Sequence, residues 1–247
     1  MINEIDYRPY PPPEKPFVMH QTWQDLLFMH WRVPFEELRR VVPGVLPLDT
    51  FDGSAWVGVV PFRVSGARPR FLPALPGVSN FPELNLRTYV TVKGKPGVFF
   101  FSLDAASPIA VRLARLIFRL PYFDAKMTCQ SNGEGVQYTS RRIQLEGRPP
   151  EFRARYRPVG PVFIAGRDTL EYFLTARYCL YVVNQANGSI ARCEIHHAPW
   201  PLQPAQAELT LNTLTHAHGI RLRNQPPHLL FARRLDVKVW PLAPVVD

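Results

Sequence analysis

The chain has 247 residues, of which 46% are apolar and 20% charged, a composition that fits a folded globular domain and excludes a disordered chain. Its formal net charge of +9 raises nucleic acid as a partner, because phosphate binding depends on clustered Lys and Arg. No stretch reaches the roughly 20 apolar residues of a membrane helix, and the three cysteines are too few and too widely spaced for a disulfide framework, so we expect a cytoplasmic protein without a membrane partner.

Prolines divide the chain into short elements, beginning with an extended Pro-rich arm at residues 1–16. Residues 54–64 are apolar and β-branched and predict a strand, in which Pro61 indicates an edge or a bulge. Strands at 84–92 and 98–103 flank a five-residue loop and predict a hairpin. Further strands are expected at residues 135–142, 178–183, 190–196 and 236–240.

Helices are predicted at residues 35–42, 108–119 and 169–176. Ser107 can cap the second helix, whose apolar residues form a stripe at Ile109, Leu113, Leu116 and Ile117. Asp168 with Glu171 resembles a capping box for the third helix. Several antiparallel strands with a few short helices indicate one α+β domain over residues 1–247, with a dominant sheet that can close into a barrel.

The most informative strand runs through residues 81–90, FPELNLRTYV. Because side chains alternate along a strand, its polar residues lie on one face and its apolar residues on the other. An acid, an amide, a guanidinium and a phenol on one face can orient a small polar ligand. The alternative is an ordinary solvent-exposed face. The polar residues are Glu83, Asn85, Arg87 and Tyr89.

Two further charged side chains are weaker candidates. Lys126 lies where a strand begins, and a desolvated lysine there would have a lowered pKa and act as nucleophile or base, whereas an exposed lysine would have no such role. Arg32 follows an aromatic residue and could contact a substrate, or it could form a structural ion pair with Glu36 or Glu37.

Signatures of several other functions are absent. The sequence has no GxGxxG, GxxxxGK[ST], GxSxG or HExxH motif, and no acidic residue accompanies His216 and His218 at metal-ligand spacing. We therefore expect no metal and no cofactor. The arginines are scattered, and the densest run, at residues 141–157, predicts a solvated strand and loop, so nucleic acid is a minor hypothesis.

Several segments together resemble the YqjF-like family of uncharacterised bacterial proteins, over roughly residues 23–240. They are Trp31-Arg32-Val33-Pro34, residues 81–90 (FPELNLRTYV), residues 97–105 (GVFFFSLDA), Leu120-Pro121-Tyr122, Arg177-Tyr178 and residues 197–202 (HAPWPL). More distantly the chain resembles the acetoacetate decarboxylase superfamily. That resemblance implies an antiparallel barrel or cone with the site inside and helices packed outside.

In those decarboxylases a lysine, activated by a neighbouring lysine, forms a Schiff base with a β-keto acid. In that family a proline precedes the lysine pair. The resemblance implies that this proline corresponds to Pro121 and that the two lysine positions fall on Tyr122 and Phe123. The pocket glutamate corresponds to Glu83, and the pocket arginine falls on Trp23. Without the amine there is no imine, so Schiff-base decarboxylation is not expected.

We therefore predict a barrel that binds a small carboxylate or oxo-acid in a pocket containing Glu83, Asn85, Arg87 and Tyr122, with contributions from Tyr89 and Arg32. In an enzymatic version, a lyase-like or acid/base enzyme, Glu83 is the general acid or base, Arg87 binds the anionic group and Tyr122 stabilises an oxyanion. The alternatives are a non-catalytic ligand-binding or sensory domain and, less favoured, a nucleic-acid binder. A homo-oligomer is compatible with all three.

Overall fold

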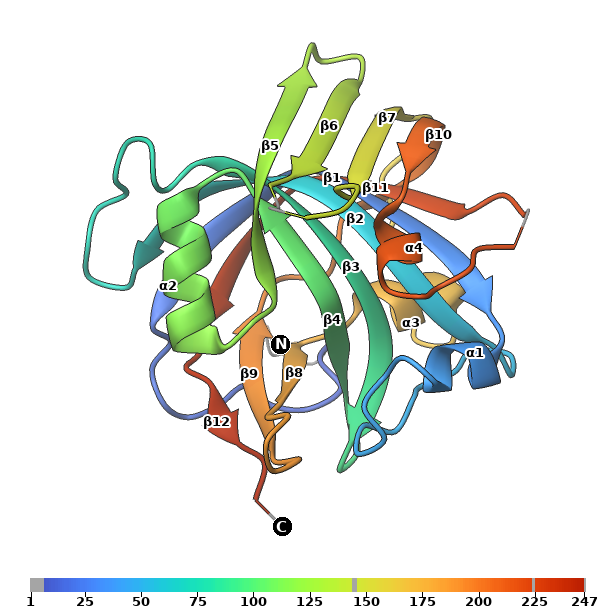
Figure 1. The fold of residues 1–247 in the computed structure, drawn as a ribbon. Coiled ribbons are helices and arrows are strands. Elements are labelled where there is room, and N and C mark those ends of the chain that lie inside the picture. The colour runs from blue at the N-terminus through green and yellow to red at the C-terminus, as the bar shows by residue number, and fades with distance from the viewer. Residues whose placement is uncertain (1–6, 144–145, 224, 247) are drawn as a thin grey trace.

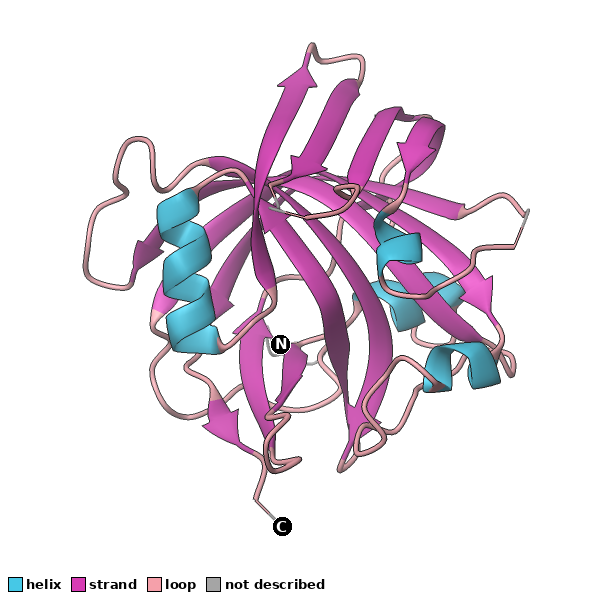
Figure 2. Ribbon diagram, viewed as in Figure 1, coloured by secondary structure: helices cyan, strands magenta, loops and turns pink. Residues whose placement is uncertain are grey.

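The computed structural model describes residues 7–143, 146–223 and 225–246, which form a strongly curved β-sheet with short helices around it (Figures 1 and 2). The strands are β1 Met19–Val33, β2 Ala55–Pro69, β3 Phe81–Val92, β4 Lys95–Ala105, β5 Tyr122–Ser131, β6 Val136–Arg142, β7 Glu151–Pro158, β8 Cys179–Val183, β9 Ile190–His196, β10 Leu202–Asn212, β11 His228–Val239 and β12 Ala243–Pro244. The helices are α1 Phe35–Arg39, α2 Pro108–Phe118, α3 Leu170–Thr175 and α4 Leu214–Ala217.

The sheet closes on itself twice. Within the described residues the strand order is β12-β9-β8-β4-β3-β2-β1-β11-β10-β7-β6-β5, and β4 also pairs with β5, which closes a ring of nine strands from β4 round to β5. A second extra pairing, β9 with β11, closes a seven-stranded ring of β9, β8, β4, β3, β2, β1 and β11. The pairings of β4 with β5 and β8 are parallel and the others antiparallel, so the predicted barrel is confirmed, as a mixed one.

Strands β11, β1, β2, β3 and β4 form a wall common to both rings, and alternation along each strand divides its side chains between them. On β3, Leu84 and Leu86 join the core that also contains Tyr138 of β6 and Phe152 of β7, inside the nine-stranded ring. Glu83 and Asn85 point the other way, into the seven-stranded ring. The face that carries the polar residues of β3 is therefore an interior face.

A bulge in β1 changes which of its residues face the interior of the seven-stranded ring. Between the pairs Gln24–Arg63 and Met29–Val59, β1 has one residue more than β2, and Asp25 adopts a positive φ of 52°. The extra residue changes the alternation, so that Trp23 and Leu26 both line the same cavity. Pro61 lies opposite this bulge on β2, which is a central strand. Of the two interpretations of Pro61, the bulge is therefore correct and the edge is not.

The predicted hairpin exists, but its strands are longer and its loop shorter than expected. The turn between β3 and β4 consists of Lys93 and Gly94, both with positive φ, 50° and 70°. This is the backbone conformation of a two-residue type I′ turn, which matches the twist of the strands it joins. Pro96 accordingly lies within β4, opposite Thr91.

The predicted helices are present with changed limits. The first ends at Arg39, and the third is capped by the Thr169 side chain, which accepts a hydrogen bond from the Tyr172 backbone N–H, so the expected cap at Asp168 is wrong. Ser107 caps α2 as predicted. The apolar stripe of α2 is largely exposed, with Leu116 at 78%, because the helix packs through Val111 and Phe118 instead. No helix in the described part of the chain is long and apolar enough to cross a membrane.

The sequence patterns missed β1 and β10 and most of β7 and β11. The alternation of β7 nevertheless explains the arginine-rich run. Phe152, Ala154 and Tyr156 are buried in the core, while Arg153 and Arg155 between them are exposed. For these residues the expectation of a solvated strand and loop is confirmed, but Arg142 in the same run is 6% exposed and pairs with Asp104 at 2.8 Å. His216 and His218, whose spacing would put both on one face of a strand, lie on and directly after α4.

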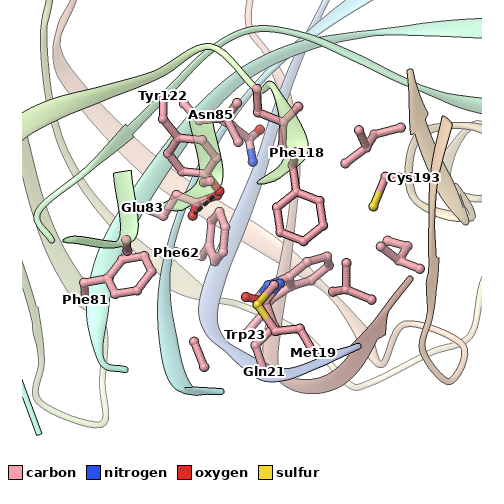
Figure 3. Close-up of a pocket in the computed structure, with 18 of the residues that line it drawn as sticks. Met19, Gln21, Trp23, Phe62, Phe81, Glu83, Asn85, Phe118, Tyr122 and Cys193 are labelled. Carbon is pink, nitrogen blue, oxygen red and sulfur yellow. Dashed lines mark hydrogen bonds between the residues drawn. The ribbon is translucent and has the colours of Figure 1, made fainter. Parts of the chain in front are cut away.

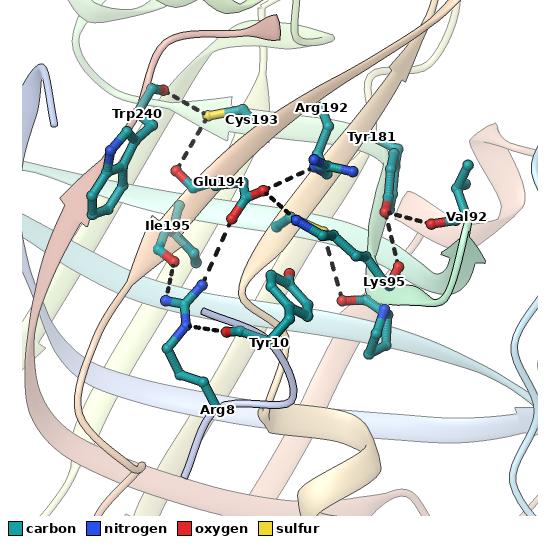
Figure 4. Close-up of polar contacts among 12 residues, drawn as sticks. Arg8, Tyr10, Val92, Lys95, Tyr181, Arg192, Cys193, Glu194, Ile195 and Trp240 are labelled. Atoms are coloured by element: carbon teal, nitrogen blue, oxygen red, sulfur yellow. Dashed lines mark hydrogen bonds and ion pairs between the residues drawn. The ribbon is translucent and has the colours of Figure 1, made fainter. Parts of the chain in front are cut away.

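The predicted arm contacts the barrel through Arg8 and Tyr10, while Glu14, Lys15 and Pro16 are exposed and residues 1–6 lie outside the described residues. Glu194 of β9 receives Lys95 Nζ at 3.2 Å and Arg192 Nε at 3.1 Å, and Arg8 Nη2 lies 3.7 Å from its other carboxylate oxygen (Figure 4). Arg8 also donates to the carbonyl of Ile195 at 2.9 Å. Because the Arg8 side chain is fully buried, these contacts attach the arm to β9.

Candidate functional site

A cavity of about 420 Å³ occupies the seven-stranded ring (Figure 3). Its walls come from the strands of the ring, from α2, and from the segment that connects β2 to β3. Most of the lining side chains are apolar, among them Trp23, Phe62, Phe81, Phe100, Phe118 and Trp200. A concave, mostly apolar space with a few polar groups is the usual form of a small-molecule site.

Glu83 and Tyr122 form a hydrogen-bonded pair in this cavity. Glu83 is 6% exposed, and the Tyr122 hydroxyl donates to its Oε2 at 2.9 Å (Figure 3). Tyr122 reaches it because the start of β5 pairs in parallel with β4, Tyr122 opposite Leu103. Burial raises the pKa of Glu83 to about 8, although the Tyr122 hydrogen bond acts in the opposite direction. The carboxyl group is thus mostly protonated at pH 7 and can donate a hydrogen bond.

Asn85 and Arg87 continue the same face of β3, and both line the cavity. Asn85 is 4% exposed, and its Oδ1 has no hydrogen-bond partner among the described residues. Arg87 donates from Nη2 to the carbonyl of Leu174 at 3.3 Å, while its buried Nε is likewise without a partner there. Buried polar atoms are normally hydrogen-bonded because leaving them unpaired costs free energy. A polar ligand in the cavity could satisfy both.

The four residues predicted to share a pocket, Glu83, Asn85, Arg87 and Tyr122, therefore do line one cavity. Tyr89 shares the strand face but not the cavity, because α3 covers that end of β3 and the ring of Phe173 lies 5.3 Å from that of Tyr89. Its hydroxyl is paired with Nε2 of His30 at 2.6 Å. The expectation that Tyr89 faces the ligand is wrong in this geometry.

Arg32 and Lys126 also lie outside the cavity. Arg32 is next to the end of β1, half-exposed, with its guanidinium 3.9 Å from Asp52 and 5.2 Å from the ring centre of Trp56. Lys126 is exposed, because β5 leaves β4 after Asp124 and continues alongside β6. Neither side chain is positioned to contact a molecule bound beside Glu83.

Two cavity residues were not selected from the sequence, although both lie in segments that carried the family resemblance. Arg177 is held by Asp49, with Nη1 2.6 Å from Oδ2, and by the carbonyl of Phe173. His197 donates from Nδ1 to the carbonyl of Ala198 at 2.7 Å and stacks on Tyr178. Burial lowers the pKa of His197 to about 4, so its ring is neutral at pH 7. Both side chains therefore already form hydrogen bonds within the protein.

The site contains no amine. All five lysines lie in the described part of the chain, and none of them lines the cavity. At the two positions where the resemblance places the lysine pair, Tyr122 donates its hydroxyl to Glu83, and Phe123 stacks against the guanidinium of Arg142 at 3.9 Å. No group of three or more His, Cys, Asp or Glu side chains that could hold a metal occurs among the described residues. Besides the carboxyl group of Glu83 and the phenol of Tyr122, the lining supplies amides, guanidinium groups, the neutral imidazole of His197 and the thiols of Cys179 and Cys193.

Comparison with known families and proteins agrees with this geometry. The family model of DUF2071, described as "Uncharacterized conserved protein", matches residues 20–236. The chain is 48% identical over 230 residues to the uncharacterized protein YqjF of Bacillus subtilis (strain 168), and the match covers 93% of both chains.

Solved structures show the same fold at much lower identity. The enduracididine biosynthesis enzyme MppR complexed with pyruvate superposes with a TM-score of 0.62 at 11% identity, covering 98% of this chain and 94% of that one. Acetoacetate decarboxylase from Legionella pneumophila gives a TM-score of 0.61 at 14% identity, covering 100% and 95%. These similarities establish the acetoacetate decarboxylase-like fold.

Proposed function

The chain belongs to the DUF2071 family, and we propose that it binds a small carboxylate or oxo-acid inside its seven-stranded ring. The observation that carries the proposal is the polar row of β3 in a mostly apolar cavity: a protonated carboxyl at Glu83, then Asn85, then Arg87. The partnerless Nε of Arg87 and Oδ1 of Asn85 support a polar occupant.

Each polar group has a distinct role in this proposal. Asn85 donates to the carboxylate of the ligand, and the positive charge of Arg87, further along β3, attracts it. The neutral carboxyl of Glu83 donates to the oxo group, and Tyr122 orients that carboxyl through its 2.9 Å hydrogen bond. The complex of MppR with pyruvate is a precedent for an oxo-acid in a protein of this fold.

In an enzyme of this design Glu83 is the general acid, and the reaction does not pass through a Schiff base because no lysine lines the cavity. A non-catalytic ligand-binding domain would use the same contacts. Incubation with each bound acid, followed by NMR of the mixture, separates the two: turnover identifies an enzyme, and unchanged ligand identifies a binding domain.

The binding proposal is tested by thermal stability in the presence of pyruvate and acetoacetate. A ligand at about 100 times its Kd adds roughly 2.7 kcal/mol to the stability of the folded state, or about 5–10 °C in Tm for a chain of this size. Wild type should show this shift, and Arg87→Met should lose most of it. Glu83→Leu should lose it too, because it removes the neutral donor that Glu83→Gln would keep as an amide. Arg32→Met, which removes an arginine outside the cavity, should keep it.

Two results would overturn the proposal. One is the absence of any shift in wild type at every acid concentration tested. The other is an equal shift in wild type and Arg87→Met, which would place the acid elsewhere. Circular dichroism of each variant without ligand confirms that it is folded before the comparison is made.

A further inference from the structure

Apolar side chains that are partly exposed to solvent surround the mouth of the cavity. It lies between α2 and the segment that connects β2 to β3. Leu113 and Ile117 on α2 are 48% and 52% exposed, and Leu72 and Leu75 across the mouth are 58% and 57% exposed, yet all four line the cavity. Contiguous exposed apolar side chains around an opening are typical of a surface that contacts an apolar ligand.

Glu83, Asn85 and Arg87 lie away from this mouth, in order along β3, whereas Arg68 lines the cavity at the end of β2, next to the mouth. Strand β3 begins at Phe81, directly after the segment that forms one side of the mouth, and Glu83, Asn85 and Arg87 follow on the same face. At about 3.3 Å per residue, Arg87 lies roughly 13 Å further along the strand than Glu83. The carboxylate and the oxo group of a 2-oxo acid are on adjacent carbons, so one acid end cannot span this distance. An acid end held by Glu83 and Asn85 directs the rest of the ligand past Phe81 towards the mouth, with the positive charge of Arg87 behind it.

The volume of the cavity exceeds what a minimal oxo-acid needs. At roughly 30 Å³ for each water-sized group, about 420 Å³ holds at least a dozen non-hydrogen atoms, about twice the number in pyruvate. The space beyond Glu83 is enclosed mainly by Trp23, Phe62, Phe81 and Phe118 (Figure 3). Aromatic and aliphatic walls favour hydrocarbon over further polar groups.

From the row of polar groups, the volume and the apolar mouth, we propose that the ligand is an amphipathic oxo-acid or carboxylic acid of roughly eight carbons in all, a size that follows from the cavity volume. Its acid end lies at Glu83 and Asn85, with Arg87 behind it, and its hydrocarbon end extends towards the leucines of the mouth. This inference rests on the proposed function and names the class of acid that the site selects.

The test is calorimetric titration with the straight-chain 2-oxo acids from pyruvate to 2-oxodecanoate, each below its micellar concentration. Each added methylene should tighten binding about fourfold, the factor that corresponds to roughly 0.8 kcal/mol of apolar transfer. The gain should stop once the chain reaches the mouth, near 2-oxooctanoate. Octanol, which lacks the acid end, should bind far more weakly than 2-oxooctanoate.

Matched variants on α2 locate the hydrocarbon end. Leu113→Ser removes an apolar group from the mouth and should weaken 2-oxooctanoate several-fold while leaving pyruvate unchanged. Leu116→Ser is the control, since Leu116 is 78% exposed on the same helix but does not line the cavity. Leu116→Ser should leave the affinity for both ligands unchanged.

The two proposals fail in different ways. If pyruvate and 2-oxooctanoate bind with equal Kd, the inference about the hydrocarbon body is wrong while the proposed acid site stands. If none of the acids binds, the proposed function itself is wrong. If octanol matches 2-oxooctanoate and Arg87→Met has no effect on either, the cavity does not recognise the acid group, and both proposals are overturned.

Discussion

Replacing Glu83 by Gln should change how the stability of the protein depends on pH. The substitution keeps the size of the side chain and an oxygen that accepts from Tyr122, but removes the ionisation. In the folded protein burial raises the pKa of Glu83 from 4.5 to about 8. Between these pH values the unfolded chain releases the proton and the folded chain retains it, so wild-type stability falls as pH rises.

The size of the effect follows from the shift. A difference of one pKa unit corresponds to about 1.4 kcal/mol, so ionisation of Glu83 lowers the free energy of unfolding by roughly 3 to 4 kcal/mol between pH 5 and pH 8. Above about pH 8 the folded protein also releases the proton, and the curve levels off. Glu83→Gln lacks this contribution, so its stability relative to wild type should rise steadily across the same interval.

Urea denaturation without ligand, followed by tryptophan fluorescence at pH 5, 6, 7, 8 and 9, measures the free energy of unfolding of each protein. Other titrating groups contribute equally to both curves, so the difference between wild type and Glu83→Gln isolates this carboxyl group. Glu134→Gln, at an exposed glutamate, is the control and should follow wild type. Parallel curves for wild type and Glu83→Gln would refute the burial argument.

Two further substitutions test the surroundings of the site. Tyr122→Phe removes the hydrogen bond that lowers the pKa of Glu83, so that pKa should rise further and the pH-dependent loss of stability should move to higher pH; a move to lower pH would contradict the assigned donor. Gly97→Ala should destabilise the protein by about 1–3 kcal/mol in urea, because its Cβ would lie 2.6 Å from Cys179 Sγ and 2.8 Å from the Cys179 carbonyl oxygen. Gly44→Ala, with nothing within 4 Å of the new Cβ, is its control, and equal losses would refute the packing argument.

Local patterns determined much of what the sequence could predict. Alternation along residues 81–90 places Glu83, Asn85 and Arg87 on one face whatever the rest of the fold, because successive side chains of a strand point to opposite sides. The Ser107 cap and the α2 helix follow from hydrogen bonds between near neighbours in the chain. The family resemblance added Tyr122, a residue that no local pattern joins to Glu83.

The tertiary structure decided which of these faces became a site. Whether the polar face of β3 meets solvent or a cavity depends on the pairing of β9 with β11, whose residues Ile195 and Val239 are distant in sequence. That α3 covers Tyr89, and that Arg32 lies outside the cavity near the end of β1, also depends on packing between elements that are far apart in the sequence. Local sequence determines which side chains share a face, whereas ring closure depends on the summed interactions of strands far apart in the chain, which no short pattern contains.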